Sequence, residues 1–467
     1  MQSNIEYRSP TASGLDQIRI GDRTQIERVR FSPEVKGPEG LEALRRGRNA
    51  LTDGDPLTIS GFRAQNIRSQ PRFKQYRSQI QGLFTRRPIY YFEPVELFRY
   101  RRPRQLVTYS LRGDIADIKD FYAKIRDRNF DRAIDKLPTF TQPFIEAQID
   151  SLLDTRDNLP DNQNQIQTSD HVHEAWRAKR TDQGYPTFIS EIIDEAENTP
   201  DSAVIPPVPP VLQSSGQDVI TRTVGYNDLV WDHCKTSFED ASSGTTTAYL
   251  HFYIDKGIFA PSADNDGRVI TAIRNQLNTR PYAGLAITIS NLSNIWNAGY
   301  DEALERFISE LEVISHDKSI PLVAPRSGYY GMYLTDYGVD IFSSLMNGNL
   351  ELNRKGGAPS EVAKYGTLPI YDRCVDVTVD SLTTILARRQ GRLYSVQGIP
   401  DSPQIFNPTE NTLEAQYGKP KQFRVGYGKQ RRLLHLQEAR EIQAEIKQGT
   451  PHPATRYFET SDHPDLS

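Results

Sequence analysis

The sequence predicts an α/β fold, a (β/α)8 TIM-barrel-like core with an irregular basic N-terminal extension and a C-terminal helix. Short β-rich runs alternate with helix-length amphipathic stretches between residues 106 and 386, a rhythm typical of parallel strands joined by helical crossovers. The length of 467 residues suits one barrel of about 250 residues with extensions. We therefore expect an N-terminal extension with a basic, aromatic segment over 1–104, the barrel over 105–386, and a C-terminal loop region with a docked helix over 387–467.

Six runs of strand length mark the expected barrel strands: residues 106–111, 203–211, 248–255, 284–290, 320–324 and 339–343. The run over 203–211 is the least typical, because its prolines cannot donate the hydrogen bonds of a central strand. Between the runs that begin at 284 and 320, Asp301 opens an expected helix with apolar residues on one face, Leu304, Phe307, Ile308 and Leu311. Residues 431–449 carry a similar apolar stripe and predict the terminal helix.

Composition is that of a soluble globular protein. Hydrophobic residues make up 37% and charged residues 25% of the chain, and 23 Tyr and 19 Phe exclude a mostly disordered protein. Two cysteines, Cys234 and Cys374, are too few for a disulfide scaffold or a cysteine-rich zinc site. No signal-like N-terminus and no run of about 18 apolar residues occurs. We therefore expect a cytoplasmic protein that enters no membrane and needs no metal or cofactor.

The net charge of -4 hides two opposed blocks. Residues 62–104 contain 11 basic and two acidic residues, whereas residues 146–202 contain 13 acidic and four basic ones. The basic block also holds aromatic residues, and this combination suits phosphate contacts beside base stacking. The candidate nucleic-acid-binding residues are Arg86, Arg87, Tyr90, Tyr91, Arg99, Arg101, Arg102 and Arg104. The alternatives are pairing of the two blocks with each other, or two ordinary solvated surfaces.

Polar residues that end or follow the expected strands are the candidates for a site, because barrel active sites form at the carboxyl ends of the strands. They are Asp255, Ser290, Asn291, Arg326, Asp340 and Ser343. Carboxylate, guanidinium and amide groups at one end of a barrel would suit a polar, ring-shaped or phosphorylated ligand.

Three segments carry a resemblance to a known family: 282–292, 320–328 and 337–344. In order and spacing they resemble the late strands of the tRNA-guanine transglycosylases, including the branch that inserts 7-deazaguanines into DNA. That family reads Gly-x-Ala-x-Gly-Gly-Leu, then a strand entering a loop that contains histidine and glycine, then Gly-x-Asp-x-Phe-Asp. The resemblance implies a (β/α)8 barrel that exchanges guanine in nucleic acid for a 7-deazaguanine through a covalent aspartate–ribose link. The position matched to that nucleophile is Asp340.

The chain also departs from the family pattern. Thr288 and Ile289 stand where the family has paired glycines, and Ser343 stands where its last motif has a second aspartate. The family's zinc site of three cysteines and one histidine is absent, since only Cys374 lies in the expected region. These departures predict a diverged member with an altered substrate or lost activity.

Three function hypotheses follow. The first is exchange or recognition of a purine or 7-deazapurine base in DNA or RNA, with Asp340 as nucleophile and Asp255, Ser290, Asn291, Arg326 and Ser343 around the ligand. The second is a catalytically inactive barrel that binds nucleic acid or a protein. The third is a barrel enzyme acting on a small phosphorylated metabolite. Single residues also have structural alternatives: a helix cap or pairing with a nearby arginine for Asp340, a loop salt bridge for Arg326 and a buried, hydrogen-bonded imidazole for His251.

Overall fold

A computed structural model gives the fold of the protein. It describes residues 17–20, 24–27, 30–35, 56–59, 89–92, 115–137, 185–197, 202–240, 246–260, 265–290, 300–328, 330–345, 367–370 and 375–378, with Val107, Leu111, Gln142, Ile145, Glu146 and Leu292. The helix expected over 431–449, like the rest of 387–467, lies outside the described residues.

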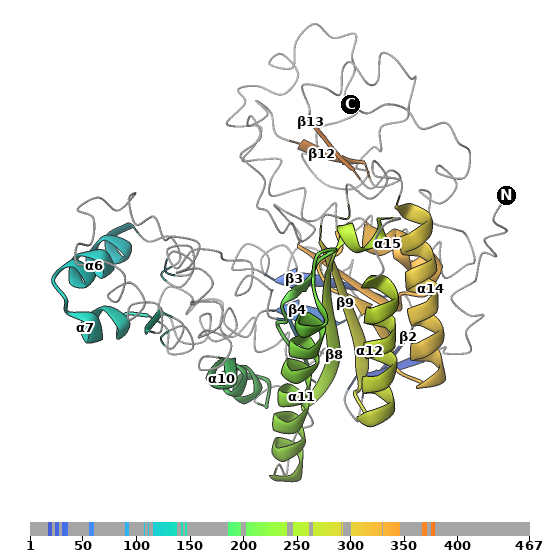
Figure 1. The fold of residues 1–467 in the computed structure, drawn as a ribbon, viewed down its shortest axis with the longest axis horizontal. Coiled ribbons are helices and arrows are strands. Elements are labelled where there is room, and N and C mark those ends of the chain that lie inside the picture. The colour runs from blue at the N-terminus through green and yellow to red at the C-terminus, as the bar shows by residue number, and fades with distance from the viewer. Residues whose placement is uncertain are drawn as a thin grey trace, which may run out of the picture.

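Eight parallel strands form a closed barrel (Figure 1). Around the barrel they are β3 (Arg30–Val35), β4 (Leu57–Ile59), β5 (Ile89–Phe92), β6 (Ser202–Ile205), β8 (Thr246–Asp255), β9 (Gly284–Ser290), β10 (Leu322–Ala324) and β11 (Ile341–Leu345). The last strand pairs with the first, in a register that joins Ile341 to Arg30 and Leu345 to Glu34. The predicted TIM-barrel-like α/β fold is therefore confirmed.

The barrel begins earlier in the chain than predicted. β3, β4 and β5 lie within residues 1–104, which the sequence assigned to an extension, so the expected boundary at residue 105 is wrong. β11 ends at Leu345, and the later β12 (Thr367–Ile370) and β13 (Val375–Thr378) form a separate antiparallel pair. The early strands escaped notice because runs of three to six residues show too little alternation to be recognised.

Two residues of the strand expected over 106–111 are described, Val107 and Leu111, and neither lies in a strand. Val107 is helical and Leu111 lies in a turn, and the Leu111 N–H donates a helix-type hydrogen bond to the Val107 carbonyl at 2.9 Å. Both side chains are buried in the core. The β-branched and aromatic composition of this run favours a strand, but tertiary packing overrides that local preference.

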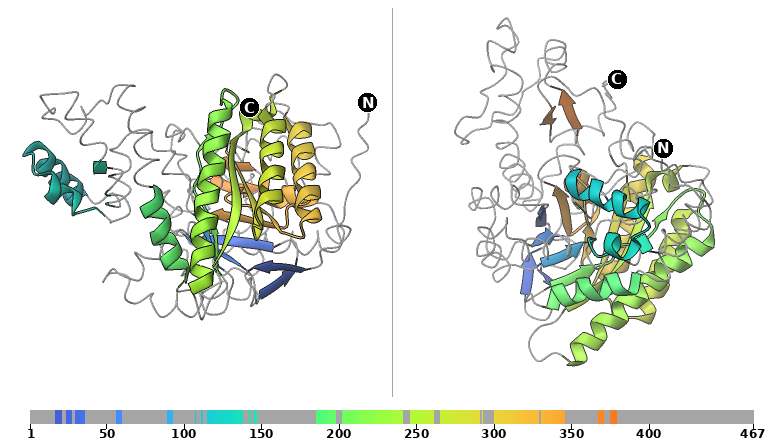
Figure 2. Two further views of the ribbon diagram at one scale, coloured as in Figure 1. Left: turned by 60° about the horizontal axis from the view of Figure 1, so that its bottom comes forward. Right: turned by 90° about the vertical axis from the view of Figure 1, so that its left-hand side faces the viewer.

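Helices cover the outside of the barrel. α11 (Gln217–Asp240), α12 (Asn265–Thr279) and α14 (Asp301–Asp317) stand side by side, with α11 and α12 against β8 and α14 against β10 (Figures 1 and 2). The helix predicted from Asp301 onward is confirmed as α14, which buries Leu304, Phe307, Ile308 and Leu311. The remaining elements are β1 (Gln17–Ile20), β2 (Thr24–Glu27), α6 (Ile115–Arg126), α7 (Phe130–Ile134), α10 (Tyr185–Glu197), β7 (Pro210–Val211), η5 (Lys256–Phe259), α15 (Tyr330–Leu334) and η7 (Thr335–Tyr337).

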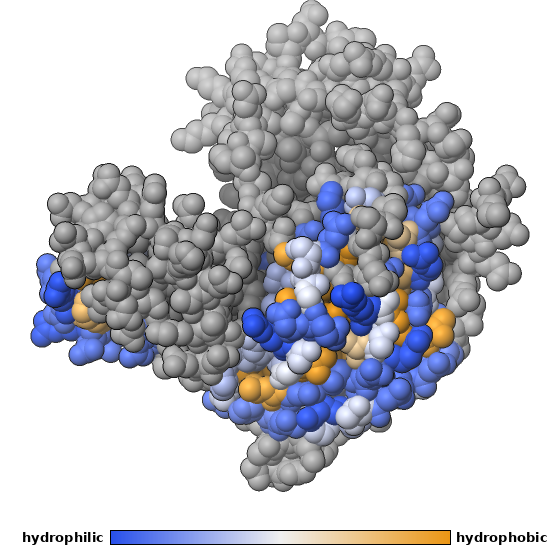
Figure 3. All heavy atoms as spheres, in the orientation of Figure 1, coloured by the Kyte–Doolittle hydropathy of each residue, from blue (hydrophilic) through white to orange (hydrophobic). Residues whose placement is uncertain are grey.

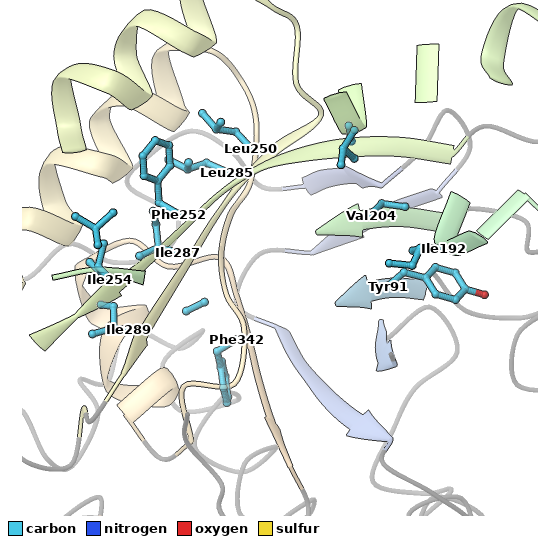
Figure 4. Close-up of a cluster of buried hydrophobic side chains, with 14 of the residues drawn as sticks. Tyr91, Ile192, Val204, Leu250, Phe252, Ile254, Leu285, Ile287, Ile289 and Phe342 are labelled. Atoms are coloured by element: carbon cyan, nitrogen blue, oxygen red, sulfur yellow. The ribbon is translucent and has the colours of Figure 1, made fainter. Parts of the chain in front are cut away.

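Successive side chains along each strand point alternately outward, toward the helices, and inward, into the barrel. On β8 and β9 the outward side chains are uniformly apolar and pack in the main core, as Figure 4 shows for Leu250, Phe252, Ile254, Leu285, Ile287 and Ile289. The solvent side of the helical layer is mainly hydrophilic (Figure 3), and Val313 is the one large hydrophobic residue exposed within the described part of the chain. The inward side chains form a separate cluster inside the barrel.

The proline-rich run after β6 is a bulged strand. β6 pairs with the first half of β8, and β7 pairs with its second half, so residues 206–209 leave the ladder between them. Their carbonyls find side-chain donors instead: the Tyr185 hydroxyl donates to the Pro207 carbonyl at 2.8 Å. The Asn227 side chain of α11 bonds the backbone N–H and carbonyl of His251, which lies in the gap. The prediction of a strand here holds for β6 and β7: Pro206, Pro207 and Pro209 fall between the two ladders, and Pro210 is the first residue of β7.

The amino-terminal end of the barrel is filled by two tyrosines. Tyr90 and Tyr249 are fully buried, their rings meet edge to face at 5.4 Å, and their hydroxyls lie 3.2 Å apart. Small residues, Ala203, Gly284 and Ala286, leave the space that these large rings occupy. Burial raises the pKa of both phenols, and the nearby Asp340 carboxylate raises it further.

The packing around Tyr249 predicts the effect of a methyl group at Gly284. A Cβ at this position would lie 2.3 Å from the Tyr249 ring, so we expect Gly284→Ala to lower the free energy of unfolding by about 1–3 kcal/mol. Denaturant unfolding followed by circular dichroism measures the change.

Gly225→Ala is the matched control for that substitution. Gly225 lies inside α11, where an added Cβ meets nothing within 4 Å, so Ala should stabilise the helix by about 0.5–1 kcal/mol. Equal effects of the two substitutions would contradict the tight packing of Tyr249.

Candidate functional site at the carboxyl ends of the strands

The barrel interior turns polar toward the carboxyl ends of its strands. Interiors of such barrels are usually filled with bulky branched apolar side chains. Here the inward positions toward the carboxyl ends of the strands carry buried polar residues, namely Ser32, Glu34, Thr58, His251, Thr288, Ser290 and Ser343, together with Arg326 from the loop after β10. They are bonded to one another, for example Ser32 to Thr58 at 2.7 Å. This polar end is where a ligand site is expected from the fold.

Two of the predicted site residues meet at the ends of β8 and β9. The register pairs Asp255 with Ser290, and the Ser290 hydroxyl donates to Asp255 Oδ2 at 2.8 Å. The other oxygen, Oδ1, accepts from the Gly257 N–H at 3.1 Å and caps η5. Asp255 is only partly buried. The pair therefore presents a carboxylate and a hydroxyl at the mouth of the barrel.

Arg326 is held by a buried ion pair with Glu34 of β3. Arg326 Nε donates to Glu34 Oε2 at 3.0 Å, Nη2 donates to Oε1, and both side chains are buried. The guanidinium also lies 5.6 Å above the ring of Phe92 on β5. This geometry matches the salt-bridge alternative for Arg326, because a two-point carboxylate contact commits the guanidinium.

The backbone of Arg326 is fixed as firmly as its side chain. Its φ of 49° lies in the left-handed region, and Gly328 follows with a φ of 62°. The Arg326 N–H donates to Ser343 Oγ at 2.8 Å, and the Ser327 N–H donates to the Ser343 carbonyl at 2.9 Å. The predicted residues Arg326 and Ser343 are thus brought together, through a main-chain contact.

His251 is a buried, neutral imidazole. Nδ1 faces the Pro206 carbonyl, which can only accept, so Nδ1 carries the proton and Nε2 accepts from the Thr288 hydroxyl at 2.8 Å. Burial lowers the pKa of His251 to about 4, although the Pro206 hydrogen bond acts in the opposite direction. Phe92 meets the imidazole edge to face at 5.8 Å, so one ring touches both His251 and Arg326. The histidine matches its structural alternative.

Asp340 lies at the opposite end of the barrel from Asp255, Ser290, Arg326 and Ser343. It directly precedes β11, is buried, and pairs with the start of β10: its N–H donates to the Leu322 carbonyl and Oδ2 accepts from the Leu322 N–H, each at 2.8 Å. The prediction of a nucleophile at the carboxyl end of the strand is wrong in position, because the ladder of β11 begins after Asp340. On this strand Ser343 faces the polar end instead.

The aromatic residues of the basic block are not on a surface. Tyr90 and Tyr91 belong to β5 and are fully buried, Tyr90 inside the barrel and Tyr91 beneath the helices. A base cannot stack on either ring, so their predicted role in nucleic-acid binding is wrong. The six arginines of that prediction lie outside the described residues, as does Asn291: Arg86, Arg87, Arg99, Arg101, Arg102 and Arg104.

Three residues near the site were not predicted. Glu34 lies in a strand that the sequence analysis assigned to an extension, and Phe92 lies in the run interpreted as a stacking surface. Gln213 lies beside Asp255, since a Cβ on Gly257 would contact both side chains. The sequence offers no clear signal for Glu34, because residues 31–35 read Phe-Ser-Pro-Glu-Val and show no continuous apolar pattern.

No family model matches the chain, and no curated protein matches it. Within the part of the chain that the structure describes, no group of three or more His, Cys, Asp and Glu residues could hold a metal ion. None of the described helices has the length and apolar character needed to cross a membrane. The geometry of the site therefore has to carry the functional argument.

The lowered pKa of His251 predicts a loss of stability in acid. Between pH 6.5 and 4 the unfolded chain binds a proton at this histidine while the folded protein does not, so the free energy of unfolding falls as the pH falls. The full contribution is about 3 kcal/mol. Denaturant unfolding at several pH values measures it.

His251→Gln should remove this part of the pH dependence, because glutamine does not titrate. His316→Gln, an exposed position on α14, is the control and should leave the dependence in place. The same slope in His251→Gln and the unaltered protein would contradict a buried neutral imidazole.

Proposed function

We propose that this protein is a diverged, guanine transglycosylase-like barrel that recognises a purine or 7-deazapurine base of DNA or RNA at the carboxyl ends of its strands. The observation that carries the proposal is the Asp255–Ser290 pair, a partly buried carboxylate beside a hydroxyl at the barrel mouth. The closed parallel barrel and the polar interior at the same end support it.

The chemistry of the pair suits the edge of a guanine. A guanine ring presents two neighbouring N–H donors, at N1 and N2, next to the O6 acceptor, and a carboxylate can accept from both donors. Enzymes that take a base out of its stack read it by such hydrogen bonds to the Watson–Crick edge. A 7-deazaguanine keeps this edge unchanged. Adenine offers an acceptor at N1, which would face the Asp255 carboxylate with no proton between them.

The proposal concerns recognition, and assigns no nucleophile. A covalent link to ribose needs a carboxylate that faces the sugar, and Asp340 lies at the other end of the barrel. Among the described barrel strands, the inward carboxylates at the carboxyl ends are Glu34, which is bound to Arg326, and Asp255. The resemblance in the late strands therefore supports the ligand class more than the exchange reaction.

A phosphorylated metabolite is the less favoured ligand. Arg326 was the residue best placed for an anion, and its guanidinium is neutralised by Glu34. A buried ion pair of this kind offers little attraction to a phosphate, since the two charges cancel.

Replacing the Asp255 carboxylate tests the proposal directly. We expect the full-length protein to bind guanine and 7-deazaguanine with similar affinity and adenine more weakly. Asp255→Asn should lower the affinity for guanine about 10- to 100-fold, because a hydrogen bond to a charged acceptor contributes about 1.5–3 kcal/mol. Isothermal titration calorimetry measures both comparisons.

Asp218→Asn is the matched control, because Asp218 is an exposed carboxylate in the first turn of α11. Asp340→Asn should also keep the affinity while it lowers stability, since Asp340 binds β10. Equal binding of guanine and adenine, or full affinity in Asp255→Asn, would sink the proposed role of Asp255.

The nucleic-acid form of the ligand predicts a strong salt dependence. Binding of a single-stranded, guanine-containing oligonucleotide, followed by fluorescence anisotropy, should weaken steeply as salt increases, because phosphate contacts release counterions. Replacing Arg101, Arg102 and Arg104 with Gln should reduce the slope of log affinity against log salt by about 2, at roughly 0.7 per phosphate contact.

The same number of charges can be removed from the outer helices as a control. Arg222→Gln, Arg268→Gln and Arg306→Gln lie on α11, α12 and α14 and should leave the slope unchanged. Salt-independent binding, or an equal loss in both triple variants, would count against the basic block as the phosphate-binding segment.

A further inference from the structure

The turn after β10 joins the proposed site to the interior of the barrel. The register aligns Val323 of β10 with Ala286 of β9, so the turn at residues 325–328 lies beside the upper half of β9, which ends at Ser290. Ser290 is the hydroxyl partner of Asp255. Continued along the chain, this register directs the turn toward Ser290, so the conformation of the turn bears on the surroundings of the Asp255–Ser290 pair.

Arg326 adopts a conformation in this turn that is unfavourable for its residue type. Its φ of 49° places a long side chain in the left-handed region, where Gly and Asn are more easily accommodated. Backbone strain of this kind persists only when the surrounding structure fixes it, and it occurs preferentially at ligand sites. The side chain of Arg326 must therefore supply contacts that a glycine could not.

The side-chain contacts come from two strands, and a third strand holds the backbone of the same residue. Glu34 of β3 binds the guanidinium at two points, Phe92 of β5 lies beneath it, and Ser343 of β11 accepts from the Arg326 N–H at 2.8 Å. The side chain enters the barrel while the backbone stays at its mouth. The position of the turn is thus set by strands that belong to the first and last parts of the barrel.

We propose that Arg326 and Glu34 are positioning residues, whose buried ion pair holds the turn after β10 as an uncharged wall of the base site. This inference rests on the proposed function. Because the two charges neutralise each other, the wall favours an uncharged planar ring such as a purine base over a phosphate. Neither side chain contacts the ligand; the pair acts through the backbone of residues 325–328.

Conservative variants of the pair separate positioning from simple stability. Glu34→Gln keeps the size of the side chain but removes its charge, and Arg326→Lys keeps the charge but cannot make the planar two-point contact. Isothermal titration calorimetry with guanine and 7-deazaguanine, at a temperature where each full-length variant is folded, should show at least a tenfold loss of affinity in both. Ser343→Ala removes only the side-chain acceptor for the Arg326 N–H and should also weaken the binding of guanine. This variant provides the test if the other two do not fold.

Arg280→Lys is the matched control at the other end of the barrel. Arg280 also binds two carboxylates, Asp228 at 2.8 Å and Asp232, and lies over the ring of Trp231 at 4.8 Å. Its replacement should lower the unfolding temperature and leave the affinity for guanine unchanged. A loss of affinity shared equally by Arg280→Lys and the Glu34 and Arg326 variants would overturn the positioning role.

The remaining outcomes distinguish the inference from the function on which it rests. Unaltered protein that binds guanine, with Glu34→Gln and Arg326→Lys folded and binding as tightly, overturns the positioning role alone. Unaltered protein that binds none of the purines overturns the proposed function and this inference with it. Inorganic phosphate should not compete with guanine; competition that Arg326→Lys abolishes would show that the guanidinium binds anions and would overturn the uncharged wall.

Discussion

The pairing of β3 with β11 is the constraint on which the rest of the structure depends, because it closes the barrel. On the outer face of this seam the rings of Phe31 and Phe342 pack 5.2 Å apart beneath the outer layer. On the inner face Glu34 of β3 reaches past β11 to Arg326 in the turn after β10, so an apolar contact holds the seam on one face and an ionic contact bridges it on the other. A buried pair of this kind contributes little net stability but is costly to break, and it thereby favours one register of closure.

Closure divides the interior into two ends with different tasks. Small residues opposite Tyr90 and Tyr249 allow close packing at the amino end, where Asp340 ties β10 to the start of β11. The carboxyl end holds hydrogen-bonded polar groups that depend on one another for satisfaction, as His251 depends on Thr288. In barrels of this kind the amino-terminal end usually contributes stability, and the carboxyl-terminal end usually forms the polar ligand site.

The sequence predicted the second half of the barrel better than the first. β8, β9 and α14 have apolar patterns long enough to show the period of a strand or a helix. The expected ends of β8 and β9 put Asp255 and Ser290 at the same edge of the barrel, and the two residues are neighbours there in the structure. β3 and β4 were missed because their inward residues, such as Glu34 and Thr58, break the apolar run. Asp340 was assigned to the wrong end of β11, because a sequence motif gives only the order of residues. The end of the strand at which Asp340 lies depends on the residue where pairing of β11 with its neighbours begins. The burial of Tyr90 and Tyr91 was not predicted, because basic neighbours in the sequence do not indicate that both faces of a strand are buried.

The bulged strand between β6 and β7 has a further consequence for the barrel wall. Pro206, Pro207, Pro209 and Pro210 leave Val208 as the single amide donor between Ile205 and Val211. With one N–H donor, this segment cannot form the backbone hydrogen bonds of a different register with β8. Two of its carbonyls already accept hydrogen bonds from the side chains of Tyr185 and His251. The missing N–H groups therefore favour a single register between this wall and β8, and with it the orientation of the inward side chains of β8, including Asp255 at its end.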